Sequence, residues 1–307
     1  MYICYAIYMA TLYTQQSRNI SRTWFLMAIF LAVIGGIGYF LSMYYNDVAI
    51  LYIALGFSMV MNITSYWFSD KIALSLAHAK EASVAEYAEL HRIVENLSIT
   101  AGLPKPRLYV INDPAPNAFA TGRNKDHAAV AVTTGLLQMM DRSELEGVIA
   151  HELSHIGNRD ILLSSVVVVL VGVISIISDM FIRSRLWGGH SDNENNRSGG
   201  ILMIIGVIFI ILSPIIATVI QLAISRRREF LADASGALLT RYPDGLASAL
   251  RKISAYGRPL QHASNATAHL YISNPFGAGA VKGLHKLFMT HPPTEDRIAA
   301  LVGTANK

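Results

Sequence analysis

The sequence contains a single cysteine, Cys4, in 307 residues. One cysteine excludes an internal disulfide framework and a zinc site built from several thiolates, so a bound metal would need histidine and carboxylate ligands. Charged residues are also scarce, at 15% of the chain, whereas 52% of the residues are hydrophobic. This balance is atypical of a soluble enzyme, and we expect part of the chain to lie in a lipid bilayer.

The excess of positive charge is small, with a formal net charge of +4. Lysine and arginine occur beside the apolar segments rather than along a face interleaved with aromatic residues. This distribution is typical of membrane topology signals and not of a nucleic-acid-binding surface, so we expect no nucleic-acid partner.

The apolar residues gather in four blocks, each of about the 20 residues that cross a hydrocarbon core. The blocks are Trp24 to Tyr45, Val48 to Phe68, Ile161 to Ile182, and Ile201 to Ile224. We predict four transmembrane helices, the last two forming a hairpin around an exposed loop at residues 183–200. A buried core helix is the alternative for each block, and a half-buried hairpin is a further alternative for the last two.

Basic residues before the first block and after the second predict that both flanks lie in the cytoplasm, because the short turn between the blocks has no positive charge. The flanking residues are Arg18, Arg22, Lys71 and Lys80. Arginines at 183, 185 and 197 weaken this orientation. The first residues do not resemble a removable signal peptide, and Met9 is an alternative start to Met1.

Between the second and third blocks the sequence has ordinary globular character. A helical pattern runs from Lys71 to Thr100, and three β-like segments follow it. The segments are Arg107 to Asn112, Asn117 to Thr121, and Ala128 to Thr133. Asp141 with Glu144 then forms a capping-box signature, which predicts the start of a helix that continues into the third block.

That helix carries the motif His151-Glu152-Leu153-Ser154-His155. Two histidines four residues apart point the same way on a helix and can hold one Zn²⁺ ion. Glu152 would then face a metal-bound water as the catalytic base. The alternative is a pair of surface histidines with an incidental glutamate.

A catalytic zinc site needs a third protein ligand, and Glu229 is our choice. His155 lies six residues before the third block and Glu229 lies five after the fourth, so both would stand about 8 to 9 Å from one membrane edge. Asp233, one turn beyond Glu229, could accept the free N–H of a ligand histidine. A solvated helix surface is the alternative for both carboxylates.

Four stretches of the sequence resemble the HtpX-like membrane metalloproteases, which are relatives of the CAAX prenyl proteases. They are Asn117 to Gly122 (NAFATG), His151 to His155 (HELSH), Ser225 to Asp233 (SRRREFLAD), and Thr290 to Ile298 (THPPTEDRI). The resemblance implies one zinc held by His151, His155 and Glu229, with Glu152 as the base. The residues before Met9 depart from the usual pattern.

The resemblance also implies that Asn117, Ala118, Phe119, Ala120 and Thr121 form an edge strand beside the cleft, where an extended substrate could pair with the main chain. His291 and Arg297 would stabilise the oxyanion or brace the site. An ordinary sheet strand, and a helix start at the two prolines after His291, are the alternatives.

We therefore predict a mainly α, α+β zincin-like (gluzincin) catalytic domain with a small sheet and four membrane helices. Its parts are residues 1–70 with the first two helices, 71–160 with the zinc motif, 161–224 as the membrane hairpin, and 225–307 with the third ligand. The predicted activity is zinc-dependent endopeptidase cleavage of misfolded or membrane proteins at the inner (plasma) membrane, with the catalytic domain in the cytoplasm. A prenyl-protein protease, a non-catalytic zinc scaffold and a transporter are the rival functions.

Overall fold

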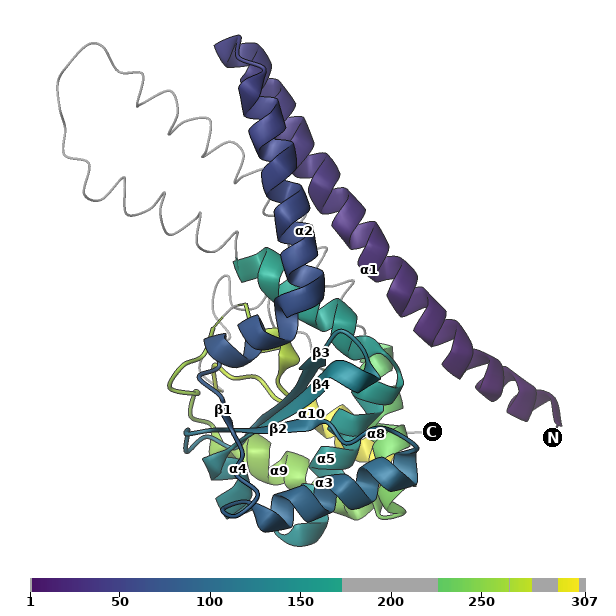
Figure 1. The fold of residues 1–307 in the computed structure, drawn as a ribbon. Helices are drawn as coiled ribbons and strands as arrows, with labels where there is room; N and C mark the ends of the chain where they lie inside the picture. Colours follow the sequence, from purple (N-terminus) through teal and green to yellow (C-terminus); the bar gives the residue numbers. More distant parts are fainter. Residues whose placement is uncertain (1, 173–225, 265, 278–291, 304–307) are drawn as a thin grey trace.

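Two long helices, α1 (Tyr2–Tyr45) and α2 (Ala49–Leu76), form an antiparallel hairpin that projects from the rest of the molecule (Figure 1). The structure is a computed structural model and describes residues 2–172, 226–264, 266–277 and 292–303. Residues Asn19–Tyr45 of α1 and the whole of α2 are long and apolar enough to cross a membrane. The first two predicted membrane helices are therefore confirmed as helices of the right length and composition.

The two hairpin helices approach each other closely because a glycine faces an alanine. A Cβ atom added at Gly38 would lie 2.4 Å from that of Ala54. Farther along, Asn62 donates a hydrogen bond to the carbonyl of Met27 across the helix pair (3.2 Å). Small residues and interhelical hydrogen bonds of this kind stabilise helix pairs in lipid, where no hydrophobic effect drives their association.

A mixed four-stranded sheet follows the hairpin, in the order β1-β2-β4-β3. The strands are β1 (Lys80–Glu81), β2 (Arg107–Ile111), β3 (Ala118–Gly122) and β4 (Ala128–Thr133). β2 and β4 are parallel, whereas β1 pairs antiparallel with β2 and β3 pairs antiparallel with β4. The three strands predicted from the sequence are present, and β3 lies at the edge of the sheet.

The prediction of one helical segment from Lys71 to Thr100 is wrong in its middle. The helix α2 ends at Leu76, the backbone turns at His78 (φ +52°), and β1 precedes a separate helix α3 (Ala88–Ala101). Lys80 pairs with Val110 of β2, thirty residues away in the sequence. Local periodicity does not reveal such a long-range pairing, although α3 does end at Gly102 as the sequence indicated.

The remaining helices pack around the sheet. They are α4 (Thr134–Met139), α5 (Arg142–Gly157), α8 (Arg226–Thr240), α9 (Pro243–Tyr256) and α10 (Thr294–Leu301), with short 3₁₀ segments η1 (Lys125–His127) and η2 (Ala268–Leu270). The predicted capping box starts α5: Asp141 accepts a hydrogen bond from the Glu144 N–H, and Glu144 accepts one from the Asp141 N–H, both at 2.9 Å.

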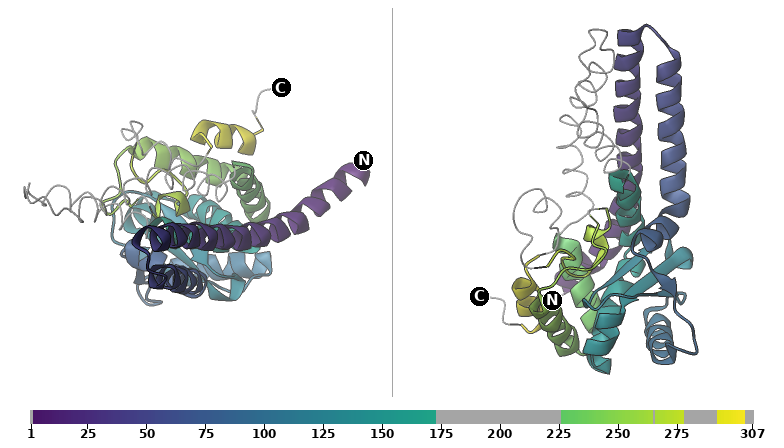
Figure 2. Two further views of the ribbon diagram at one scale, coloured as in Figure 1. Left: turned by 90° about the horizontal axis from the view of Figure 1, so that it is seen from above. Right: turned by 90° about the vertical axis from the view of Figure 1, so that its left-hand side faces the viewer.

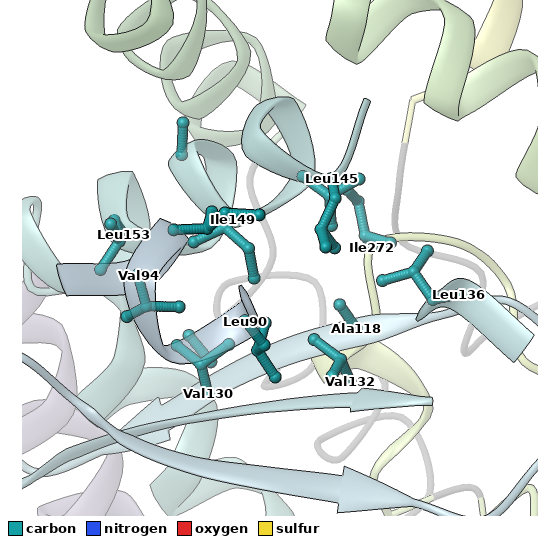
Figure 3. Packing of buried hydrophobic residues seen from close by; sticks show 14 of the residues in the cluster. Leu90, Val94, Ala118, Val130, Val132, Leu136, Leu145, Ile149, Leu153 and Ile272 are labelled. Carbon is teal, nitrogen blue, oxygen red and sulfur yellow. The ribbon is translucent and has the colours of Figure 1, made fainter. Parts of the chain in front are cut away.

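The main hydrophobic core lies between α5 and the sheet. Leu145, Ile149 and Leu153 of α5 point toward residues of α3, the sheet and α4 in Figure 3. These three leucine and isoleucine side chains recur every fourth residue, so one face of α5 is buried along its whole length. The chain after η2 joins the same core through Ile272. Residues that precede the predicted membrane hairpin in the sequence and residues that follow it thus pack in the same core.

The expectation that α5 continues directly into the third apolar block is wrong. α5 ends at Gly157, Arg159 adopts a left-handed conformation (φ +57°), and a second helix, Asp160–Gly172, leaves at 86°. The remainder of the third block, the 183–200 loop and the fourth block lie outside the described residues. Within the described part of the chain there are two candidate spans, or three if the bent helix pair counts as one.

Candidate active site

The helix α5 holds His151, Glu152 and His155 between the sheet and α8. His151 and Glu152 are each only 1% exposed, and Glu229 of α8 is buried beside them. α8 approaches α5 closely because Gly236 faces the α5 backbone, where an added Cβ would lie 3.0 Å from the His151 nitrogen. Close helix packing therefore brings the motif and the predicted third ligand together.

The ligand atoms of His151, His155 and Glu229 all lie within 4.8 Å of one another. The Nε2 atoms of the two histidines are 3.2 Å apart. Glu229 places Oε1 3.6 Å from the His155 Nε2 atom and Oε2 3.9 Å from that of His151. Two imidazole nitrogens and one carboxylate that converge on a point are a donor set that fits a single catalytic Zn²⁺ ion.

Each histidine of the cluster is oriented by a different aspartate. His151 Nδ1 lies 2.9 Å from Asp233 Oδ1, and His155 Nδ1 lies 3.1 Å from Asp160 Oδ2. A carboxylate at Nδ1 holds the proton there and leaves the Nε2 lone pair free to coordinate a metal. The role foreseen for Asp233 fits this contact, whereas Asp160 was not predicted from the sequence.

Asp160 was missed because α5 was expected to continue. In an unbroken helix a residue five positions after His155 points about 140° away from it. The break at Arg159 turns the Asp160 carboxylate back toward His155. Asn19 of α1 also donates a hydrogen bond to Asp160 (2.6 Å) and so links the first membrane helix to the site.

Arg297 of α10 is 2% exposed and braces the other aspartate. Its guanidinium donates to both oxygens of Asp233 (2.8 and 2.6 Å) and to the Ile272 carbonyl (2.9 Å). It also lies 3.9 Å from Glu229 Oε2. Arg297 therefore sits behind the ligands. His291, the other residue predicted here, lies outside the described residues.

Burial and neighbouring charges give the three motif residues different proton affinities. Burial lowers the pKa of His151 to about 4 and raises the pKa of Glu152 to about 7. Burial also disfavours the charged form of His155, but the hydrogen bond that it donates to Asp160 and the charge of Glu229 raise its pKa to about 9. The two carboxylates near His155 therefore favour its protonated form more than burial alone would.

The edge strand β3 lies beside Glu152. The backbone N–H of Ala120 faces the Glu152 carboxylate and opposes the pKa increase. Two other backbone groups of β3 are bonded to residues outside the sheet. The Ala118 carbonyl accepts a hydrogen bond from the Ile272 N–H (2.9 Å), and the Gly122 N–H donates one to Ser165 Oγ (3.1 Å). Asn117 precedes the strand and donates to the Ser273 carbonyl (3.0 Å). The predicted edge is present, and Ala120 is its point nearest to the predicted base.

Comparison with known proteins identifies the family. The family model for peptidase family M48 matches residues 84–305, which include all three metal ligands. The chain belongs to peptidase family M48. Within this family it is 48% identical over 296 residues to a "Protease HtpX homolog" of Caldanaerobacter subterraneus, covering 95% of this chain and 97% of the relative. A "Protease HtpX homolog" of Pyrococcus furiosus is 49% identical over 283 residues, covering 91% and 94%.

The M48 assignment makes the chain a membrane zinc metalloprotease of the HtpX type, with the zinc site at His151, His155 and Glu229. Its fold is similar to that of S. mikatae Ste24p, at a TM-score of 0.51 and 18% identity, over 95% of this chain and 67% of the other. At this identity the likeness concerns the fold alone. The predicted family, metal and enzyme class are confirmed.

Proposed function

We propose that this M48 protease is an endopeptidase that cleaves misfolded or membrane proteins at the cytoplasmic face of the inner (plasma) membrane, as part of protein quality control under stress. The main support is the position of the zinc ligands on α5, which leads through one sharp bend into the apolar helix Asp160–Gly172. A hydrolytic site so close to membrane helices has access to chains emerging from the bilayer.

Glu152 acts as general base and then as general acid. Its carboxylate is buried beside the ligands, and its Oε1 atom has no hydrogen-bond partner among the described residues. Zinc held by His151, His155 and Glu229 would supply a Lewis acid that lowers the pKa of water from about 15.7 to about 7. Glu152 takes the proton from the attacking water and returns it to the leaving amine. Burial raises the pKa of Glu152 above that of an exposed carboxylate, which favours its acceptance of a proton from water.

The surrounding aspartates and arginine act as positioning residues. Asp233 and Asp160 fix the ring orientations of His151 and His155 through their Nδ1 contacts. Arg297 neutralises Asp233, and its three nitrogens donate to Asp233 and to the Ile272 carbonyl. These contacts favour a role in holding Asp233 in place over the alternative role of stabilising the oxyanion. His291 remains a predicted oxyanion or bracing residue on sequence grounds alone.

Substrate would bind as an extended strand beside Asn117, Ala118, Phe119, Ala120 and Thr121. Main-chain hydrogen bonds give affinity without regard to side chains, which suits a protease with many misfolded substrates. The Ala118 carbonyl and the Gly122 N–H already contact other parts of this chain, and every residue of β3 is buried, so substrate would reach the strand only between these two contacts, at Ala120.

The membrane arrangement that we propose has four spans, of which the last lies outside the described residues and the third lies partly outside them. The distribution of Arg18, Arg22, Lys71 and Lys80 on one side of the first hairpin supports a cytoplasmic catalytic domain.

Cleavage of an unfolded test protein by detergent-purified wild-type protein and by Glu152→Gln tests the proposal, with zinc analysed in both. We expect equal zinc content, with cleavage only by the wild type. The same protein in its folded form serves as control substrate and should stay intact. Equal cleavage by both enzymes would refute Glu152 as the base, and zinc without cleavage in either would favour a scaffold function.

A further inference from the structure

A cavity of about 460 Å³ lies where α2 meets the sheet. Its lining includes Trp67, Phe68, Lys71, Arg107, Arg123 and His127. The cavity is therefore built from the end of a candidate membrane span that meets the catalytic domain, from β2, and from the turn between β3 and β4. Figures 1 and 2 show that this end of α2 stands directly on the sheet. The zinc ligands do not line it.

The depth of the cavity relative to the membrane follows from α2. Trp67 is eighteen residues after Ala49, which is about 27 Å along the helix, close to the roughly 30 Å of a hydrocarbon core. Trp24 of α1 lies at the same level, since its ring stacks on that of Tyr66 (6.0 Å). Tryptophan and tyrosine are typical of the boundary between hydrocarbon and headgroups. Lys71, one turn farther, is then at the level of the lipid phosphates.

The cationic side chains that line the cavity have different partners. Arg107 donates to Asp70 at 2.5 Å, so these two charges neutralise each other. Arg123 lies over the Trp67 ring at 4.4 Å, and its Nη2 atom is 2.7 Å from His127 Nε2. Lys71 lies over Phe68 at 5.6 Å.

A second carboxylate, Asp126, also lines the cavity, and both Asp126 and Lys71 are exposed to solvent. Because Arg107 is neutralised by Asp70, an anion would meet Lys71 and Arg123 together with the Asp126 carboxylate, which leaves one net positive charge. Both cations are held in place against aromatic rings rather than by carboxylates.

We propose that this cavity binds the phosphate headgroup of an anionic phospholipid. Two cations at phosphate depth supply the electrostatic attraction, and guanidinium and ammonium groups are both good phosphate donors. The exposed rings of Trp67 and Phe68, at 50% and 48% exposure, would contact the glycerol and upper acyl carbons of the same lipid. A free phosphate has no apolar part that could contact these rings, so we propose the lipid as the ligand. Such a lipid would tie the β3–β4 turn, and with it the edge strand, to the membrane surface.

The test uses the fluorescence of Trp67 as reporter. The two other tryptophans of the full-length protein are replaced by phenylalanine (Trp24→Phe and Trp187→Phe). The protein is placed in phosphatidylcholine nanodiscs that contain a small fraction of spin-labelled phosphatidylglycerol or, in a parallel sample, spin-labelled phosphatidylcholine. We expect the anionic label to quench Trp67 several-fold more than the zwitterionic label. Lys71→Gln with Arg123→Gln should remove this preference, because each cation lost lowers the affinity for the anionic lipid by about fivefold.

The matched control is Lys80→Gln with Arg92→Gln, which removes the same charge from exposed positions outside the cavity. This control should keep the preference, and Arg123→Lys should keep most of it. Comparing the two labels within each variant cancels any change in the intrinsic fluorescence of Trp67, and zinc content verifies that each variant is folded.

Equal quenching by both labels in the starting protein would overturn the proposal. An equal loss of preference in the control pair would also overturn it, in favour of diffuse surface attraction. Loss of the preference on adding inorganic phosphate, but not chloride at the same ionic strength, would assign the cavity to free phosphate and reject the lipid.

Discussion

The Nδ1 atom of His155 lies 3.1 Å from Oδ2 of Asp160, although the two residues belong to helices that meet at 86°. The contact exists only because the chain bends at Arg159. It completes a symmetrical arrangement in which each ligand histidine has its own carboxylate. The bend thus serves the metal site as well as the path toward the membrane.

Replacement of Asp160 by asparagine should weaken zinc binding by about 10- to 100-fold, because the histidine loses an anionic partner that raises its basicity. Competition with a chromophoric chelator in detergent measures the affinity. Asn19→Ala should weaken zinc binding by a smaller factor, because Asn19 is not bonded to a ligand histidine and reaches the site through its hydrogen bonds to Asp160 and the Asn158 carbonyl. Asp244→Asn, an exposed acidic residue of α9, is the control. Unchanged zinc affinity in Asp160→Asn would reject the orienting role.

Arg297→Met should lower the free energy of unfolding by about 3 to 5 kcal/mol, because it leaves Asp233 buried without its charge partner. Arg297→Lys should not restore stability, since an ammonium group cannot reproduce the two-pronged contact. Denaturant unfolding in detergent measures the change, and exposed Arg251→Met is the control.

Combining Arg297→Met with Asp233→Leu separates the two functions of this pair. The double variant should recover part of the stability, because apolar residues of similar size replace a buried ion pair. Zinc affinity should stay low, because His151 still lacks its carboxylate. Recovery of both properties would show that Asp233 does not orient the histidine.

Zinc removal should destabilise the fold only when the ligands are intact. At a zinc concentration about 100 times the dissociation constant, binding adds about 2.7 kcal/mol to stability. A chelator should therefore lower the unfolding midpoint of wild type and of Glu152→Gln by similar amounts, and have no effect on His155→Ala. If the chelator did not change the unfolding midpoint of Glu152→Gln, Glu152 would itself be required for zinc binding.

The metal site was predictable from the sequence because its main elements are local. The spacing of His151 and His155 and the capping box at Asp141 both depend on a few neighbouring residues. Glu229 was chosen on the premise of a continuous helix, which is wrong on the α5 side, yet the residue is in the cluster. The chain bends at Arg159 instead of continuing, but Glu229 still lies level with the two histidines.

The missed features all depend on contacts between distant residues. The strand β1 forms because Lys80 and Glu81 pair with β2, and nothing in their immediate sequence indicates a strand. The contact of Asn19 with Asp160 joins residues 141 positions apart. The bracing position of Arg297 likewise depends on how α10 packs against α8 and the Ile272 segment. Sequence periodicity reports which face of a helix is buried, but not the identity of its partner.

The close approach of α8 to α5 yields the final prediction. A Cβ added at Gly236 would lie 3.0 to 3.2 Å from backbone atoms of Ala150 and His151, which belong to a rigid helix and cannot move aside easily. Gly236→Ala should therefore push the helices apart, at a cost of about 1 to 3 kcal/mol in stability. The shift also separates Glu229 from the histidines, so zinc affinity should fall with stability.

Gly56→Ala is the matched control for this substitution, because its added methyl group meets nothing within 4 Å. Chelator competition and unfolding of both variants distinguish the two effects. If Gly236→Ala lost stability but bound zinc as tightly as wild type, the spacing between α5 and α8 would not set the geometry of the ligands. Loss of affinity in Gly236→Ala alone would identify this glycine as the residue that brings the third ligand within reach of the metal.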